Sequence, residues 1–423
     1  MKKLFFLLFI SYTTVFAQQK NIPFFTVSGL QKNPTLLENT NLLQNFQIQR
    51  EIITAQNKSP QISLTADYLF APFFFDNGRI IGITNDPSPK AYGYDVGITN
   101  GGLYSAQVNV AVPLFNKAML NNLYTQNKVE SQVSANNIRQ TRYDAEKGII
   151  DQYILAYQFL EQTLYLQKII ERLRDRKPLV EALVKKGLLQ QNDYLLLDIQ
   201  MLNSENDLKQ MEFAYINGVN LLKNLSLIGD TATFLLDKPA LEINSDPQER
   251  FYLSKYKLDS LNLVAQQNVF NNKYRTQFSL IGTSGINATD IANVPHNVGL
   301  SAAFHVGIPI SDGKQKKMNN RSIAILLKNQ ILYRDNAALI LQNNLRNARR
   351  QTEQWKETVK INDGLIQKQE LLLDIIKDKV VKGQVTVMDY INALHDYNIM
   401  LKNRAIAETN VYLYINQYNY YNH

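Results

Sequence analysis

The sequence contains few residues whose types and spacing could support catalysis or metal binding. No cysteine is present, which excludes disulfides, thiolate metal sites and a cysteine nucleophile. No glycine-rich phosphate loop, Gly-x-Ser-x-Gly elbow or plausible catalytic triad occurs. The histidines lack the i, i+4 pairing that sets two imidazoles on one helix face for zinc. They are His296, His305, His395 and His423. We therefore predict a protein that is not an enzyme and that holds no metal and no other cofactor.

The charge balance gives no sign of a nucleic-acid partner. The formal net charge is +8 over 423 residues. The basic residues are scattered among acidic ones along the expected helices, an arrangement typical of a solvated helix surface rather than a nucleic-acid footprint. We expect the chain to bind no nucleic acid.

Two aspartates stand at equivalent positions of a repeated sequence. Lys186-Gly187 followed by Asp193-Tyr194 recurs, 196 residues later, as Lys382-Gly383 followed by Asp389-Tyr390. Pro113 and Pro309 are separated by the same 196 residues. A constant offset at two landmarks excludes a net insertion between them, as expected for a rigid element rather than a loop. Even without a further role, a carboxylate at such a helix start would interact favourably with the helix dipole.

The element between the landmarks is predicted to be a helix of unusual length. At the helical rise per residue, the 74 residues from 113 to 187 would give a rod of roughly 110 Å. The second copy, from Lys314 to Lys382, contains no proline and a single glycine. Its apolar residues recur at steps of four and seven, which indicates a narrow seam facing a partner helix. The seam consists of Ile361, Leu365, Leu372, Ile376 and Val380.

The first rod is less regular, and both rods are expected to turn back on themselves. Gly148 and Pro178 interrupt the first copy, and we expect Pro178 to kink the rod near its end. Gly187 and Gly383 suit a helix C-cap or a tight reversal. Returning helices after these glycines would complete a pair of long helical hairpins.

Alternating sequences predict strands ahead of each rod. In residues 105–112, Ala106, Val108, Val110 and Val112 would face one way, and Ser105, Gln107 and Asn109 the other. Residues 61–68 and 300–308 alternate in the same way. One interpretation is a soluble sheet with one buried face, and the other is a membrane β-barrel with lipid outside and a wet lumen inside. The alternation does not separate them; the N-terminus and the duplicated rods favour the barrel.

The N-terminus has the parts of a secretory signal peptide. Lys2 and Lys3 precede an apolar run, and Val15-Phe16-Ala17 offers a small-residue cleavage site. No stretch has the roughly 20 apolar residues of a transmembrane helix. Membrane insertion must then use β-strands, which can also satisfy their own backbone polar groups in lipid. The expected organisation is a signal peptide (1–17), a first repeat of β-hairpin and helical hairpin (18–230), an equatorial linker (231–250) and a second such repeat (251–423).

The duplicated order of β-hairpin, proline, rod, Lys-Gly-x5-Asp turn and returning helix resembles the TolC-like outer-membrane efflux proteins. The resemblance covers essentially the whole mature chain and rests on residues 112–116 and 308–313 and on the two turns. It implies an α+β membrane protein: a homotrimer in which each subunit gives four strands to a twelve-stranded β-barrel, continued by a long periplasmic α-helical coiled-coil barrel. Because four strands alone cannot close a barrel, oligomerisation would be required.

The resemblance also implies which surfaces are functional. The helical turns would contact a periplasmic adaptor protein through Lys186, Gly187, Lys382 and Gly383. Pro113 and Pro309 would mark the transition from barrel to helices.

The periplasmic entrance would be lined by acidic residues of the last helix. Asp389 matches the first of two such positions, while the second falls at Asn392, so one carboxylate ring is expected. Three carboxylates near one axis would attract cations and raise each other's pKa. Asp193 has the weaker claim of the two aspartates. In some relatives polar contacts hold the entrance shut, but here Val380 and Val385 occupy the matching positions and cannot make them.

The implied function is a passive exit duct for small organic molecules in the cell outer membrane, with a long periplasmic extension and contacts to outer-membrane lipid. An inner-membrane transporter of RND or ABC type would drive export through the adaptor. One alternative is the outer-membrane component of type I protein secretion. Another, from a different class, is a periplasmic adaptor or a coiled-coil structural protein, although adaptors normally carry one helical hairpin rather than two.

Overall fold

The computed structural model of the chain describes residues 19–84, 86–94, 102–230, 232, 234–244, 251–289 and 291–423. The expected signal peptide, residues 1–17, lies outside these residues. The chain divides into two compact units. The sheet unit comprises Asn41–Ala135 and Lys255–Tyr333, and the helical unit comprises Met1–Thr40, Asn136–Ser254 and Arg334–His423.

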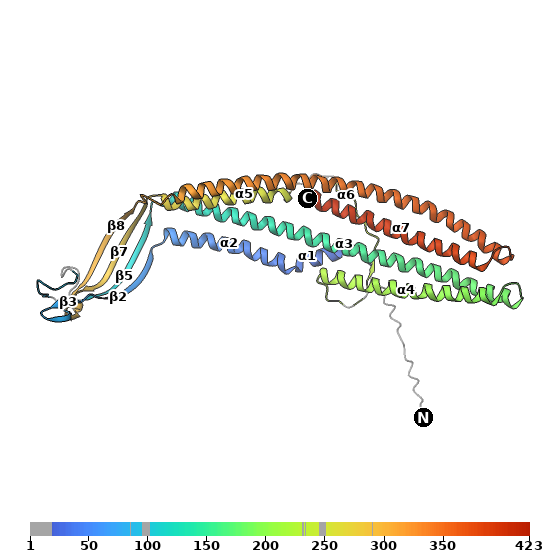
Figure 1. Cartoon of the computed structure of the whole chain (residues 1–423), viewed down its shortest axis with the longest axis horizontal. Helices are drawn as coiled ribbons and strands as arrows, with labels where there is room; N and C mark the ends of the chain where they lie inside the picture. The colour runs from blue at the N-terminus through green and yellow to red at the C-terminus, as the bar shows by residue number, and fades with distance from the viewer. Residues whose placement is uncertain are drawn as a thin grey trace, which may run out of the picture. The chain divides into compact units, whose positions relative to one another are not determined.

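The sheet unit contains a four-stranded antiparallel sheet with the strand order β2-β5-β7-β8 (Figure 1). Its strands are β2 (Gln61–Phe70), β5 (Gly102–Leu114), β7 (Gln277–Ala288) and β8 (Val298–Gly307). Each repeat supplies one hairpin, and the pairing of β5 with β7 joins the two hairpins. Among the described strands, β2 and β8 each pair on one side only, so their outer edges present unpaired backbone groups.

The side chains of this sheet divide between an apolar and a polar face, as the alternation predicted. Leu64 lies opposite Val108 in the register, and Leu280 lies opposite Phe304. On the polar face, the Asn109 amide donates a hydrogen bond of 2.8 Å to the Thr65 hydroxyl. The residues of the apolar face are largely exposed; Leu64, for example, has 75% of its surface accessible. A soluble sheet would bury this face, whereas this chain leaves it uncovered.

The segment between β2 and β5 contains a small hairpin. The hairpin is formed by β3 (Phe73–Asp76) and β4 (Arg79–Gly82). In the second repeat, the short 3-10 helix η2 (Ile291–His296) lies between β7 and β8. The two repeats therefore share the strands and differ mainly in this connection.

Two long helical hairpins follow the strands, as predicted. They are formed by α3 (Lys117–Lys185) with α4 (Gln191–Leu225), and by α6 (Gln315–Val381) with α7 (Val387–Asn422). The expected interruption of the first rod does not occur, because α3 continues through Gly148 and Pro178. Leu173 and Val180, on either side of Pro178, are both buried. Their burial offsets the roughly 3 kcal/mol that an interior proline costs a helix.

Three helices that precede the strands were not predicted. They are α1 (Ile22–Lys32), α2 (Pro34–Lys58) and α5 (Phe251–Phe270), the last followed by the 3-10 helix η1 (Asn271–Tyr274). Each repeat thus begins with a helix ahead of its β-hairpin. None of the side chains of α2 is buried. Without a buried stripe there is little periodicity for sequence reasoning to detect.

Residues 234–244, part of the predicted linker, join the N-terminal segment in a small core of the helical unit. Strand β6 (Leu235–Leu236) pairs in parallel with β1 (Gln19–Lys20). The Tyr153 hydroxyl, fully buried in α3, reaches the carbonyl oxygens of Lys20 at 2.9 Å and Asp237 at 2.6 Å. Burial raises the pKa of Tyr215, whose hydroxyl donates to the Phe234 carbonyl at 2.6 Å, to about 12. The hydroxyls of Tyr153 in α3 and Tyr215 in α4 therefore stay neutral at physiological pH and hold this segment by hydrogen bonds.

No helix in the described part of the chain has both the length and the apolar character needed to cross a bilayer.

Candidate functional site

The two turns that join the long helices have the same construction. Gly187 and Gly383 adopt positive φ angles of 71° and 67°, which glycine tolerates without strain. The Gly187 N–H donates to the Val184 carbonyl, and the Leu188 N–H donates to the Leu183 carbonyl. Gly383 and its successor repeat this pair of bonds, which defines a Schellman C-cap. The prediction of a glycine C-cap at each turn is confirmed.

The third residue of each returning helix is an aspartate whose carboxylate accepts hydrogen bonding from the residue three positions earlier. Oδ2 of Asp193 accepts from the Gln190 backbone N–H at 3.0 Å. Oδ2 of Asp389 accepts from both the Thr386 backbone N–H at 2.9 Å and the Thr386 hydroxyl at 2.7 Å. The Asp389 N–H donates back to the Thr386 hydroxyl at 3.1 Å, which completes a capping box. The Gly-x5-Asp spacing is therefore the distance from a glycine C-cap to the third residue of the next helix.

These bonds favour the charged form of Asp389 in the isolated chain. The Thr386 hydroxyl and backbone N–H hold the pKa of this carboxyl below its usual range. Asp389 is therefore ionised at neutral pH. In a trimer, the mutual repulsion of three Asp389 carboxylates would raise their pKa and so oppose the lowering by Thr386.

Polar residues predominate on the exposed face of the first turns of α7, although Met388 is also exposed. Asp389, Asn392 and Asp396 are exposed and follow one another at i, i+3 and i+7, so they lie along one side of the helix. Sequence reasoning missed Asp396, which the i+7 spacing from Asp389 could have revealed. The first hairpin differs, since α4 exposes Leu195 and Ile199 at its start. The two hairpins thus offer different surfaces near their turns.

The turn residues expected to meet an adaptor are all accessible. Lys186, Gly187, Lys382 and Gly383 are exposed.

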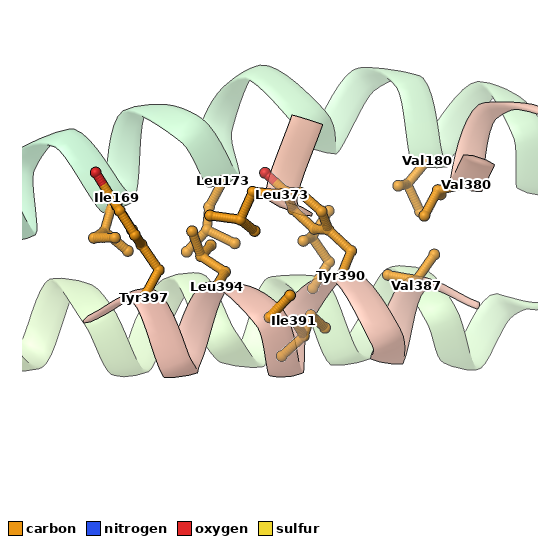
Figure 2. Packing of buried hydrophobic residues seen from close by; sticks show 12 residues of the cluster. Ile169, Leu173, Val180, Leu373, Val380, Val387, Tyr390, Ile391, Leu394 and Tyr397 are labelled. Atoms are coloured by element: carbon orange, nitrogen blue, oxygen red, sulfur yellow. The ribbon is translucent and has the colours of Figure 1, made fainter. Parts of the chain in front are cut away.

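A hydrophobic core directly behind the turns holds the two hairpins together. Figure 2 shows Leu173, Leu373 and Leu394 meeting in this core, with the side chains of Val180, Val380 and Val387 nearer the turns. All six are nearly inaccessible to solvent. Val385 packs against the same core, so both valines at the supposed gating positions are apolar core residues.

A polar contact links the two hairpins at the far end of this core. Nη2 of Arg172 in α3 lies 3.4 Å from a carboxylate oxygen of Glu370 in α6, which also accepts a hydrogen bond from the Tyr397 hydroxyl. The Arg172 guanidinium lies 4.9 Å from the centroid of the Tyr397 ring. Burial and the Glu370 bond raise the pKa of Tyr397 to about 12, so the phenol remains a donor at neutral pH.

The predicted seam of α6 coincides only in part with its buried stripe. Ile361, Leu365 and Leu372 of the predicted seam are exposed. Val380 is buried as predicted and Ile376 packs partly buried against the same core, which also contains Leu373. The apolar residues of α6 therefore form two stripes, one used inside the chain and one left open. Periodicity alone cannot distinguish them, because both stripes repeat at helical spacing.

The predicted transition from strands to helices differs between the repeats. Pro113 lies inside β5, opposite Ser279, whereas Pro309 lies two residues beyond the end of β8. In the second repeat, Asp312 caps α6 by accepting from the N–H groups of Lys314 at 2.9 Å and Lys316 at 2.7 Å. These bonds keep the pKa of Asp312 low.

Replacing Thr386 by alanine is expected to loosen the first turn of α7 by about 1 kcal/mol, the usual value of an N-cap side chain. Amide hydrogen exchange at residues 387–391 should accelerate by about fivefold. The control Thr358→Ala removes a hydroxyl that bonds only within α6, to the Gln354 carbonyl, and should leave this segment unchanged. Because the pKa of Asp389 is depressed, the cap is complete at neutral pH and weakens only as the pH falls through that lowered value. Equal exchange in both variants would contradict this role of Thr386.

No group of three or more potential metal ligands occurs among the residues that the structure describes.

Solved membrane-channel structures match almost the whole chain. No protein-family model matches the sequence, and no curated protein sequence matches it significantly. The open state of the Neisseria gonorrhoeae MtrE outer membrane channel has a TM-score of 0.73 at 11% identity, over 95% of this chain and 88% of that chain. The outer membrane protein VceC from Vibrio cholerae has a TM-score of 0.72 at 11% identity, over 95% of both chains. The Campylobacter jejuni CmeC outer membrane channel has a TM-score of 0.71 at 12% identity, over 94% and 85%. The chain therefore has the TolC-like fold of outer-membrane channels.

Proposed function

We propose that this chain is one subunit of a trimeric outer-membrane channel, a passive exit duct for small organic molecules. An inner-membrane transporter of RND or ABC type would deliver the molecules through a periplasmic adaptor. The observation that carries the proposal is the four-stranded sheet, which exposes an apolar face along its strands and has a polar face opposite. Water disfavours such an apolar face, whereas lipid accommodates it.

The unpaired edges of the sheet support assembly. β2 and β8 form its two edges, and in a bilayer their free N–H and C=O groups would be costly. Pairing β8 of one copy with β2 of the next satisfies both edges, and three copies would give the twelve-stranded barrel. The polar face, with Thr65, Asn109 and Ser301, would then line the lumen.

The match to outer-membrane channels over nearly their whole length favours a channel over an adaptor or a simple coiled coil. Together with the expected signal peptide, it favours the outer membrane as the location, with the helices extending into the periplasm. The exposed turns at Gly187 and Gly383 would meet the adaptor.

Asp389 would form the acidic entrance. Its carboxylate is exposed and its pKa is low, so three copies around an axis would present negative charge to entering ions. Asn392, one turn further along the same face, would form a neutral second ring.

Single-channel recording in planar bilayers tests this proposal. Detergent-extracted protein should give discrete, cation-selective conductance. Asp389→Asn should reduce the cation selectivity, and Asn392→Asp should increase it by adding a second carboxylate ring. The control Asp378→Asn removes one exposed carboxylate from α6 near the same turn and should change the selectivity little. Protein that is soluble without detergent and gives no conductance would refute the channel.

A further inference from the structure

Basic side chains gather in the sheet unit where the strands give way to helices. We name them the junction cluster: Lys58, Lys117, Lys273, Arg275, Lys314, Lys316, Lys317 and Arg321. All eight are exposed. They lie at the end of α2, at the start of α3, immediately before β7 and at the start of α6. Together they mark the helical end of the sheet.

The positive charge of the junction cluster is not neutralised within the described part of the chain. Residues 313–333 contain five basic and no acidic residues. The ion pairs found in the described residues all lie in the helical unit, and none involves the junction cluster. Asp312, the nearby acid, accepts hydrogen bonds from the backbone N–H groups of Lys314 and Lys316, and its single negative charge offsets only one of the eight positive charges. The cluster therefore keeps a strong net positive charge.

The positive charge of these lysines does not stabilise α6, the helix that carries them. Lys316 and Lys317 lie in the first turn of α6, which contains no acidic residue. The positive end of the helix dipole disfavours cations at this position. An external anion would relieve both the dipole term and the mutual repulsion of the lysines.

The junction cluster adjoins the end of the apolar face. Phe115 is 81% exposed and Ile310 is 97% exposed, each within four residues of a basic side chain. The Lys316 ammonium lies 5.2 Å from the centroid of the Tyr274 ring. Tyr274, Arg275 and Phe115 also line one pocket of about 670 Å³. Apolar and cationic side chains therefore lie next to each other along the helical end of the sheet, rather than on separate surfaces.

We propose that the junction cluster binds the phosphate-bearing headgroups of anionic phospholipids at the membrane surface that faces the helices. The inference rests on the proposed insertion of the sheet into a bilayer. A lipid leaflet supplies hydrocarbon that can cover Phe115 and Ile310, and it supplies negative charge that can pair with the lysines. The long lysine side chains can extend from the apolar edge to the headgroup layer. A nucleic acid would satisfy the charge but not the exposed apolar residues.

Lipid retention by a matched pair of variants tests the inference. The junction variant is Lys314→Gln/Lys316→Gln/Lys317→Gln. The control variant, Lys356→Gln/Lys360→Gln/Lys368→Gln, removes the same charge from exposed positions further along α6. Each full-length protein is equilibrated in micelles containing equal amounts of phosphatidylglycerol and phosphatidylcholine, and the lipid retained after gel filtration is measured by mass spectrometry.

The wild type and the control variant should retain phosphatidylglycerol preferentially. In the junction variant the preference for phosphatidylglycerol should fall at least tenfold. Each lysine near an anionic surface raises the affinity roughly fivefold. Raising the salt concentration should weaken the wild-type preference. An unchanged preference in the junction variant, or an equal loss in both variants, would overturn the inference.

Conductance in bilayers of phosphatidylcholine alone separates this inference from the proposed function. Channels that conduct there, from a wild-type protein that shows no preference for phosphatidylglycerol in the micelle experiment, would refute the headgroup site and leave the channel proposal intact. A wild-type protein that neither inserts nor conducts would refute the channel itself.

Discussion

Replacing Leu64 by arginine is expected to prevent most of the protein from inserting into the membrane. Leu64 lies near the middle of β2, on the exposed apolar face and opposite Val108. An arginine on the lipid face of a transmembrane barrel costs about 2–4 kcal/mol at the bilayer midplane. A trimer would meet this cost in every subunit. In a soluble sheet the same substitution, at a side chain exposed to water, would change stability by no more than about 0.5 kcal/mol.

The matched control for this change is Ser63→Arg. Ser63 is the neighbouring residue of β2, is also exposed, and lies on the polar face opposite Asn109. After folding in the presence of lipid vesicles, the fraction of each variant that floats with the vesicles in a density gradient gives the yield. The wild type and Ser63→Arg should float, and Leu64→Arg should remain in the dense fractions. Equal flotation of the two variants would show that the apolar face does not contact lipid.

Replacing Leu373 by alanine is expected to lower the free energy of unfolding of the helical unit by about 2–5 kcal/mol. Leu373 is 2% exposed and meets Leu173 and Leu394 in the core behind the turns. Truncation removes buried methyl groups and leaves a cavity between two hairpins that can close only partly. Alanine has a high helix propensity, so the loss would come from packing rather than from α6 itself.

Leu372→Ala provides the control within the same helix. Leu372 is 43% exposed and belongs to the open stripe of α6. Urea unfolding of the detergent-solubilised protein, followed by circular dichroism at the helical band, should show a clearly lower midpoint for Leu373→Ala and a small change for Leu372→Ala. If the open stripe meets a neighbouring subunit, chemical cross-linking should show fewer trimers for Leu372→Ala. The reverse ranking of the two midpoints would mean that the buried stripe is misassigned.

The elements that sequence reasoning located correctly are those defined by short-range rules. The strands follow from a period of two, and the hairpin turns follow from glycines that adopt positive φ at Gly187 and Gly383. The constant offset of 196 residues predicted two equivalent hairpins, and α4 and α7 start that distance apart, at Gln191 and Val387. In each case the determining residues are close together in the chain.

The candidate site was only partly predictable. The positions of Asp193 and Asp389 at the helix starts followed from spacing, and the structure adds their capping bonds. The roles of Asp389, Asn392 and the turns in an entrance remain predictions. Asp396 is not one of the positions matched by the resemblance, and only its i+7 spacing from Asp389 places it on the same helix face.

Local sequence patterns specify the two repeats, the long hairpins, the turns and the two faces of the sheet, because period and turn chemistry act over a few residues. Tertiary structure alone decided that α2 is a helix with no buried side chain, that α3 continues through Pro178, and that Leu373 rather than Leu372 is buried. These outcomes depend on which surfaces meet, and the partners of Leu373 lie in α3 and α7, far from it in the chain. A local pattern shows which apolar faces a helix has. Which of these faces is buried depends on the free energy of packing against elements that are distant in the chain.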